Sequence, residues 1–294
     1  MTNDRKKLQE DINRLYSAEH AALGEIATQK HLSKGRELAQ KHNLADTLSS
    51  GGVLVFPHTS VNDCGYQVAA CVIAALDSGA KKVVVISVLH AFSDEMETAR
   101  QEVAAGADPH NYACRGIQGE QSERKEWQKD HALMSWRYFW NAEIKRRKLK
   151  NPPEVYEFYP YLAGGKPETL AGIEELKEFV KDAVIVSTAD PFHHGIGYGD
   201  SLENSFEPDA KGLQKAKDIV LGGAKLLEDA DYWGYNQHCV AAKSDARDAG
   251  QVFRYIRGRL RAEIVDISYS DASKLYNAVP PTWVLGAIFQ WHKV

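Results

Sequence analysis

The chain has no apolar run close to the roughly 20 residues that a membrane-spanning helix requires, and its first residues are charged rather than apolar. Only four cysteines occur among 294 residues and none form a CxxC pair, which argues against a disulfide framework and a zinc knuckle. A basic excess is also absent, because the net charge is −4, so a nucleic-acid partner is not expected. These absences predict a cytoplasmic protein with free thiols and no membrane contact.

Hydrophobic residues make up 44% of the chain, which is enough for the core of one large domain. Residues 1–46 are predicted to form a helical extension, in which Leu8, Ile12 and Leu15 follow helical spacing. These helices could cover either the core or a second copy of the chain. Whether the chain forms a homo-oligomer is therefore left open. Residues 47–294 are expected to form the main domain.

Short apolar runs separated by helical patterns predict the sheet of this domain. Residues 53–56 and 83–89 are strand-like, and residues 62–76 between them have helical spacing, which together make a βαβ unit. Further strands are expected at 155–158, 183–186, 263–270 and 283–291, further helices at 121–149, 167–180, 208–227 and 246–261, and a long surface loop at 91–119. The expected fold class is α/β, with a central mixed, largely parallel sheet flanked by helices and an N-terminal helical extension.

Histidines follow three of the predicted strands. His58 and His90 end the first two, and Asp190 and His193 follow the strand at 183–186 in a glycine-rich loop. Because ligands of open α/β sheets bind at the carboxyl ends of the strands, these side chains are expected to converge. Neutral imidazoles with one anionic ligand suit zinc, iron or copper.

The same segments resemble motifs of the Memo family, which is related to the class III extradiol (LigB-type) dioxygenases. The Val-Phe-Pro-His sequence of residues 55–58, followed by a helix and then by residues 83–90, resembles the family pattern "PHA … GPSH". Residues 187–193 look like its "SSDFxHxG" segment, and residues 130–132 look like its "EHS" segment. Cys239 falls where Memo proteins carry their site cysteine. The resemblance runs from about residue 53 to the last strand.

Four positions depart from the family pattern. Thr59 stands where a small residue is usual, residues 87–89 read Ser-Val-Leu in place of Gly-Pro-Ser, Met134 replaces a glutamate, and Val240 replaces a glycine. The chain is therefore identified as a divergent member, whose substrate does not carry over from the family.

The resemblance implies a mononuclear metal held by His58 and His90, with a third, anionic ligand. That ligand is a cysteine in Memo, here Cys239, and a glutamate in the dioxygenases. If a carboxylate takes this place, the acidic residues just upstream of Cys239 are the candidates: Glu228, Asp229 and Asp231.

The resemblance also implies acid/base residues beside the metal. His193 looks like the acid/base histidine of the dioxygenases, with Asp190 three residues earlier to orient its imidazole. His131 and His194 complete the predicted catalytic set, and His194 is expected to point elsewhere unless the loop is shifted by one residue.

The predicted function is a non-haem iron(II) oxygenase that uses dioxygen on a small aromatic or phenolic substrate. Copper or zinc would also suit the ligands. Two alternatives stay open, a non-catalytic metal-binding or interaction protein of the Memo type and a metal-dependent hydrolase. The substrate, the regiochemistry and the oligomeric state are not predicted.

Overall fold

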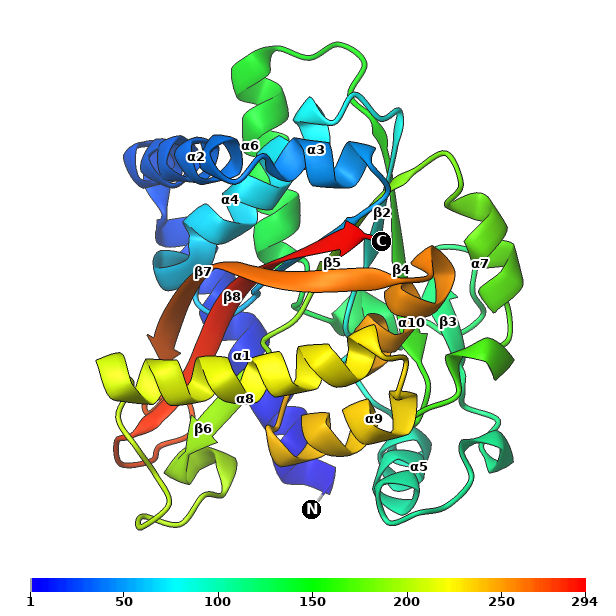
Figure 1. Ribbon diagram of the computed structural model, residues 1–294. Helices are drawn as coiled ribbons and strands as arrows, with labels where there is room; N and C mark the ends of the chain where they lie inside the picture. The colour runs from blue at the N-terminus through cyan, green and yellow to red at the C-terminus, as the bar shows by residue number, and fades with distance from the viewer. Residues whose placement is uncertain (1) are drawn as a thin grey trace.

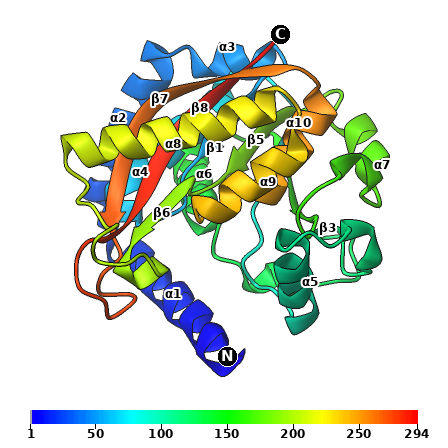
Figure 2. The same ribbon diagram turned by 60° about the horizontal axis from the view of Figure 1, so that its bottom comes forward.

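A computed structural model describes the backbone of residues 2–294 and the side chains of residues 7–294. The fold is α/β, as predicted, with an eight-stranded mixed sheet between two layers of helices (Figure 1). Figure 2 shows α1 (Thr2–Ala22) extending from the end of the molecule that carries β6.

Four adjacent strands form the parallel part of the sheet. Their order is β4 (Glu154–Tyr161), β2 (Lys82–Ile86), β5 (Val184–Thr188) and β1 (Val53–Phe56). All three of their pairings are parallel. Their carboxyl ends therefore meet at one edge of the sheet.

Antiparallel strands complete the sheet on both sides. β3 (Gly116–Gly119) pairs with β4, and β8 (Thr282–Lys293) pairs with β1. β6 (Phe192–Gly195) and β7 (Leu260–Asp271) both pair with β8. The parallel order that was predicted for most of the sheet is thus confined to its four central strands.

Alternating side chains of the strands supply two hydrophobic clusters, one on each face of the sheet. Leu54 and Phe56 of β1 belong to the cluster that packs under α4 (Val61–Asp77) and α6 (Met134–Arg147). Val53 and Val55 belong to the other cluster. Every residue of β1 is buried, because helices cover both faces.

The second cluster lies under the helices in the foreground of Figure 1. These are α7 (Ile173–Phe179), α8 (Ala210–Glu228), α9 (Tyr232–Ala241) and α10 (Arg247–Arg257). The loop that joins α9 to α10 passes the carboxyl ends of the parallel strands, which brings Asp245 to them.

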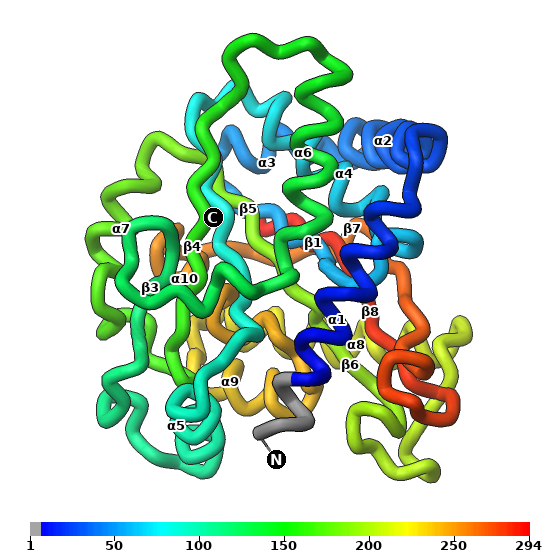
Figure 3. Tube along the Cα trace, turned by 180° about the vertical axis from the view of Figure 1, so that it is seen from behind, coloured from blue at the N-terminus to red at the C-terminus, as the bar shows by residue number. Residues whose placement is uncertain are grey.

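The N-terminal helices belong to the same packed structure. Buried residues of α2 (Gly24–Lys41) and α3 (Leu44–Ser49) lie in the cluster that contains α4. Helix α1 contacts α4 and α6. It lies toward the viewer in Figure 3, which shows the molecule from behind. The predicted boundary at residue 46 stays a prediction.

Several predicted elements need correction. The helix predicted at 121–149 begins at Met134, after a short 3-10 turn at Glu126–Lys129. The segment predicted as a loop at 91–119 contains α5 (Asp94–Ala104) and β3. Among the residues described, no helix combines the length and the apolar character that a bilayer span requires.

Candidate metal centre

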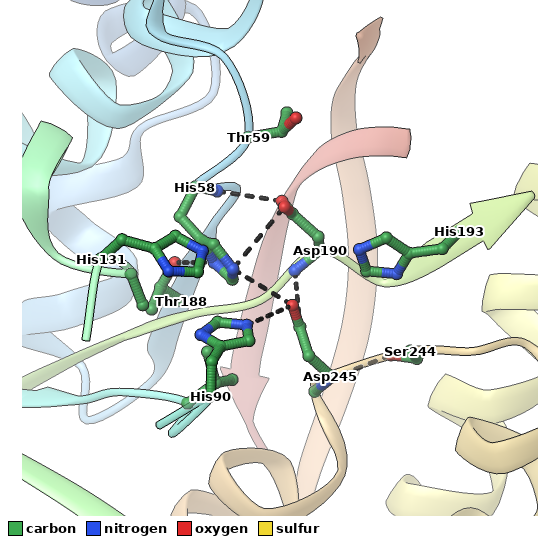
Figure 4. A network of polar contacts seen from close by, with 12 residues as sticks. His58, Thr59, His90, His131, Thr188, Asp190, His193, Ser244 and Asp245 are labelled. Carbon is green, nitrogen blue, oxygen red and sulfur yellow. Dashed lines mark hydrogen bonds and ion pairs between the residues drawn. The ribbon is translucent and has the colours of Figure 1, made fainter. Parts of the chain in front are cut away.

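The three strand ends meet at the carboxyl edge of the parallel strands. His58 follows β1, His90 follows β2, and Asp190 follows β5, which lies between the other two. His131 comes from the turn before α6, and Asp245 comes from the loop between α9 and α10. The parallel topology therefore gathers side chains from distant parts of the sequence at one point (Figure 4).

Hydrogen bonds fix the ring of His58. Its Nδ1 lies 2.9 Å from Thr188 Oγ1, and that hydroxyl donates to the carbonyl of Phe56. The hydroxyl proton is thus already used, so Thr188 must accept the proton of His58 Nδ1. Nε2 is left facing Asp245 Oδ2 at 3.1 Å and Asp190 Oδ2 at 3.6 Å.

His90 is oriented by a carboxylate. Its Nδ1 donates to Asp130 Oδ1 at 3.1 Å, and its Nε2 lies 3.3 Å from Asp245 Oδ2. Asp130 also accepts the backbone N–H groups of His90, Ala91 and Ala132. A carboxylate held in this way sets the tautomer of a metal-ligating histidine and raises its basicity.

Asp245 is the residue at which the two imidazoles converge. Its Oδ2 is shared between His58 Nε2 and His90 Nε2, and its Oδ1 accepts the backbone N–H of Asp190. Ligand atoms about 2.1 Å from a metal, at angles of roughly 90–110°, lie about 3.0–3.4 Å from one another. The separations of 3.1 and 3.3 Å in this site match that range.

Asp245 was missed by sequence reasoning. It lies downstream of Cys239, whereas the predicted carboxylates lie upstream. Its sequence context, just before α10 (Arg247–Arg257), reads like an ordinary polar helix start, so nothing local marks it as a ligand. Among the residues described, Glu228, Asp229 and Asp231 are not in either group of side chains that could hold a metal.

His131 lies in the centre rather than beside it. Its ring stacks on that of His90, with centroids 4.4 Å apart, and lies 5.9 Å from that of His58. These three histidines form one group that could hold a metal, and His58, Asp190 and Asp245 form another. Gln9 of α1 contacts His131 Nδ1 at 2.9 Å, so the N-terminal helix closes this side of the centre.

His193 and His194 point to opposite sides of β6, as alternate residues of a strand do. His193 donates from Nδ1 to the carbonyl of Lys243, and Figure 4 shows its ring beside Asp190. His194 accepts the N–H of Phe206 and faces Asp200, away from the centre. The predicted acid/base residue His193 is therefore close to the centre, and His194 is not.

Cys239 lies outside both groups of potential metal ligands. It is buried on α9, and its thiol interacts with Tyr235 and Ser244. Burial raises the pKa of the thiol to about 12, which disfavours the thiolate that metal binding requires. In place of Cys239, Asp245 is the residue that faces both His58 and His90.

The charges of the centre favour binding a cation. Burial lowers the pKa of His90, but Asp130 and Asp245 outweigh burial and raise it to about 10. Burial and the neighbouring His90 lower the pKa of His131 well below its usual value, so His131 is neutral. Burial raises the pKa of Asp245, and the imidazoles of His58 and His90 more than reverse this, so the carboxyl is ionised. A metal ion can therefore replace the protons between these groups.

A cleft of about 440 Å³ opens onto the centre. His90, His193 and Asp245 line it, and Leu8 and Ile12 of α1 form part of its wall. A separate, mostly apolar cavity of about 40 Å³ lies under α8–α10 and is too small for an organic substrate. The larger cleft has room for a small molecule beside His90 and Asp245.

Two imidazoles whose Nε2 atoms face one ionised carboxylate fit a divalent transition metal, because each donor is held in its orientation by a second residue. The chain matches no protein-family model and no curated protein. The class of this site is therefore defined by its geometry alone.

Proposed function

We propose that the chain is a non-haem iron(II) oxygenase that uses dioxygen on a small aromatic or phenolic compound. The observation that carries the proposal is the convergence of His58 and His90 on one carboxylate oxygen of Asp245. Two histidines and one carboxylate on one face of a metal are the ligand set of non-haem iron(II) oxygenases. Iron bound there would offer adjacent open positions for a substrate and dioxygen.

Other residues around these ligands support the proposal. His193 lines the cleft and is held by the Lys243 carbonyl, so its imidazole is placed to take a proton from a phenolic hydroxyl and return it. Leu8, Ile12 and Val88 give part of the cleft an apolar wall. The likeness to the Memo and LigB-type proteins supports the same proposal through the motifs at His58, His90 and His193.

A zinc-dependent hydrolase is the second candidate, and one observation favours it. His58, His90 and His131 offer ligand atoms within 4.8 Å of one another, and three-histidine sites serve zinc enzymes that activate water. A metal-binding protein without turnover would use either ligand set, but it would not need His193 in the cleft.

Metal analysis and oxygen consumption separate these candidates. Protein purified without air is expected to hold about one iron per chain and to consume dioxygen with members of a panel of catechols and aminophenols. Ester hydrolysis by a zinc form, without oxygen consumption by the iron form, would favour the hydrolase instead. Retention of metal with neither activity would favour the binding protein.

We also propose a cytoplasmic location for the chain. All four cysteines are free and buried, which is consistent with the cytoplasmic location that we propose.

A further inference from the structure

Helix α1 reaches over the centre and adds residues that the strands and their turns do not supply. Leu8, Gln9 and Ile12 line the cleft, and the ring of Tyr16 lies 5.3 Å from that of His131. The segment that resembles the Memo family begins after this helix. The contacts of α1 with His131 are therefore a feature of this chain and are not implied by the resemblance.

A backbone carbonyl fixes the orientation of two side-chain amides of α1. The carbonyl oxygen of Lys129 can only accept, and it receives a hydrogen bond of 2.9 Å from Asn13 Nδ2. The amide oxygen of Asn13 therefore faces Gln9, whose Nε2 donates to it at 3.4 Å. The same nitrogen of Gln9 lies 2.9 Å from His131 Nδ1. Because an amide nitrogen is only a donor, His131 Nδ1 has to accept.

This contact decides where His131 carries its proton. A neutral imidazole that accepts at Nδ1 is protonated at Nε2, and an imidazolium would place a second N–H against the donor of Gln9. Figure 4 shows the ring facing His58, and its centroid lies 4.4 Å from that of His90. Among residues 7–294, no group accepts a hydrogen bond from Nε2 of this buried ring. With Nδ1 bonded to α1, Nε2 is the nitrogen left for the centre.

We propose that Gln9 and Asn13 keep His131 out of the ligand set of the metal by holding its proton on Nε2. A ring nitrogen ligates a metal only through an unprotonated lone pair. The set that remains is the two histidines and one carboxylate of the proposed oxygenase, so the inference rests on the proposed function and deepens it. Gln9 and Asn13 are positioning residues, because they act on the metal site only through His131.

These hydrogen bonds predict a nuclear magnetic resonance signature that needs no metal. Protonated and unprotonated ring nitrogens have well-separated chemical shifts, and the signals of His131 are those that disappear in His131→Asn. In the full chain without metal, Nε2 is expected to be protonated and Nδ1 unprotonated. In Gln9→Glu the carboxylate can only accept, so Nδ1 should become the protonated nitrogen.

Zinc affinity tests whether the tautomer controls the ligand set. In Gln9→Glu the lone pair of Nε2 is free to join His58 and His90, and zinc should bind at least roughly 10-fold more tightly, the scale on which one partner changes a metal site. The double variant Gln9→Glu/His131→Asn keeps the added charge but lacks the third imidazole, so it should show little of this gain. Gln29→Glu, at an exposed position of α2, is the surface control and should match the native chain in both measurements. Thermal melts establish that each variant is folded.

The results separate this inference from the proposed function. A native chain with Nδ1 protonated, or the same tautomer in Gln9→Glu, would show that α1 does not place the proton of His131. Equal gains in zinc affinity in the single and double variants, or no gain in either, would show that the tautomer does not control the ligand set. The chemical shifts involve neither metal nor turnover, so the role of Gln9 stands on them even where the iron form consumes no dioxygen.

Discussion

Asp130 gives a direct test of the proposed metal centre, because it contacts the proposed ligand His90 but would not contact the metal itself. It accepts the ring N–H of His90 and the backbone N–H groups of His90, Ala91 and Ala132. It is fully buried as a side chain. Asp130→Asn keeps the shape of this side chain but replaces one acceptor oxygen with a donor.

The structure sets the size of the expected effect. In Asp130→Asn the amide NH₂ must face either the His90 ring or the backbone N–H groups, so at least one donor–acceptor pair is lost. Loss of a partner that orients a ligating histidine costs about 10- to 100-fold in metal affinity, which is about 1.4–2.7 kcal/mol. The unpaired buried group should also lower the free energy of unfolding by about 1–3 kcal/mol.

Two assays measure these effects separately. Zinc affinity is measured by competition with a chromophoric chelator, and the stability of the metal-free protein is measured by urea unfolding. Asp182→Asn is the control, because Asp182 is 75% exposed and pairs with Lys82 at the surface, away from the centre. Unchanged zinc affinity in Asp130→Asn, despite a loss of stability, would refute the view that Asp130 orients a metal ligand.

Three further predictions address other groups. Cys239→Ala should keep metal affinity within about twofold, and alkylation of Cys239 should be equally slow with and without metal because its thiol is buried; protection by metal alone would restore it as a ligand. His193→Ala should keep metal and lose turnover by about 10²- to 10⁴-fold, and joint loss of both would make it a ligand. Burial opposes ionisation of Glu143, but Arg146 and Arg147 lower its pKa to about 2. Its contribution to stability is therefore complete above about pH 4.5 and lost as pH falls towards 2. Urea unfolding should show that Glu143→Gln removes about 2 kcal/mol at pH 7 and less at pH 2; a constant difference would contradict this.

The sequence was sufficient for the parallel strands and for the histidines that follow them. Residues 53–56 and 83–89 are continuous apolar runs, and buried parallel strands are the ordinary setting for such runs. Since parallel strands end at one edge, His58 and His90 could be expected to meet, and the structure places their rings 5.1 Å apart.

Other parts depend on tertiary contacts that no local pattern shows. β6 (Phe192–Gly195) lies in a stretch that reads as a glycine-rich loop, and only its pairing with β8 makes it a strand. α9 (Tyr232–Ala241) is polar and aromatic, without a clear apolar period, and packs against α8 and α10. Asp245 follows α9, so its approach to His58 depends on how this helix packs and was not predictable from its neighbours.

The proposed metal centre rests on Asp245, and one comparison tests it most directly. Iron(II) is titrated without air into the native chain, Asp245→Ala and Cys239→Ala, and bound iron is counted after gel filtration. We predict about one iron per native chain and per Cys239→Ala chain, and much less in Asp245→Ala, because the remaining side chains lack the one carboxylate that faces both His58 and His90. Full iron retention by Asp245→Ala, with loss from Cys239→Ala, would contradict the assignment of Asp245 as the carboxylate ligand.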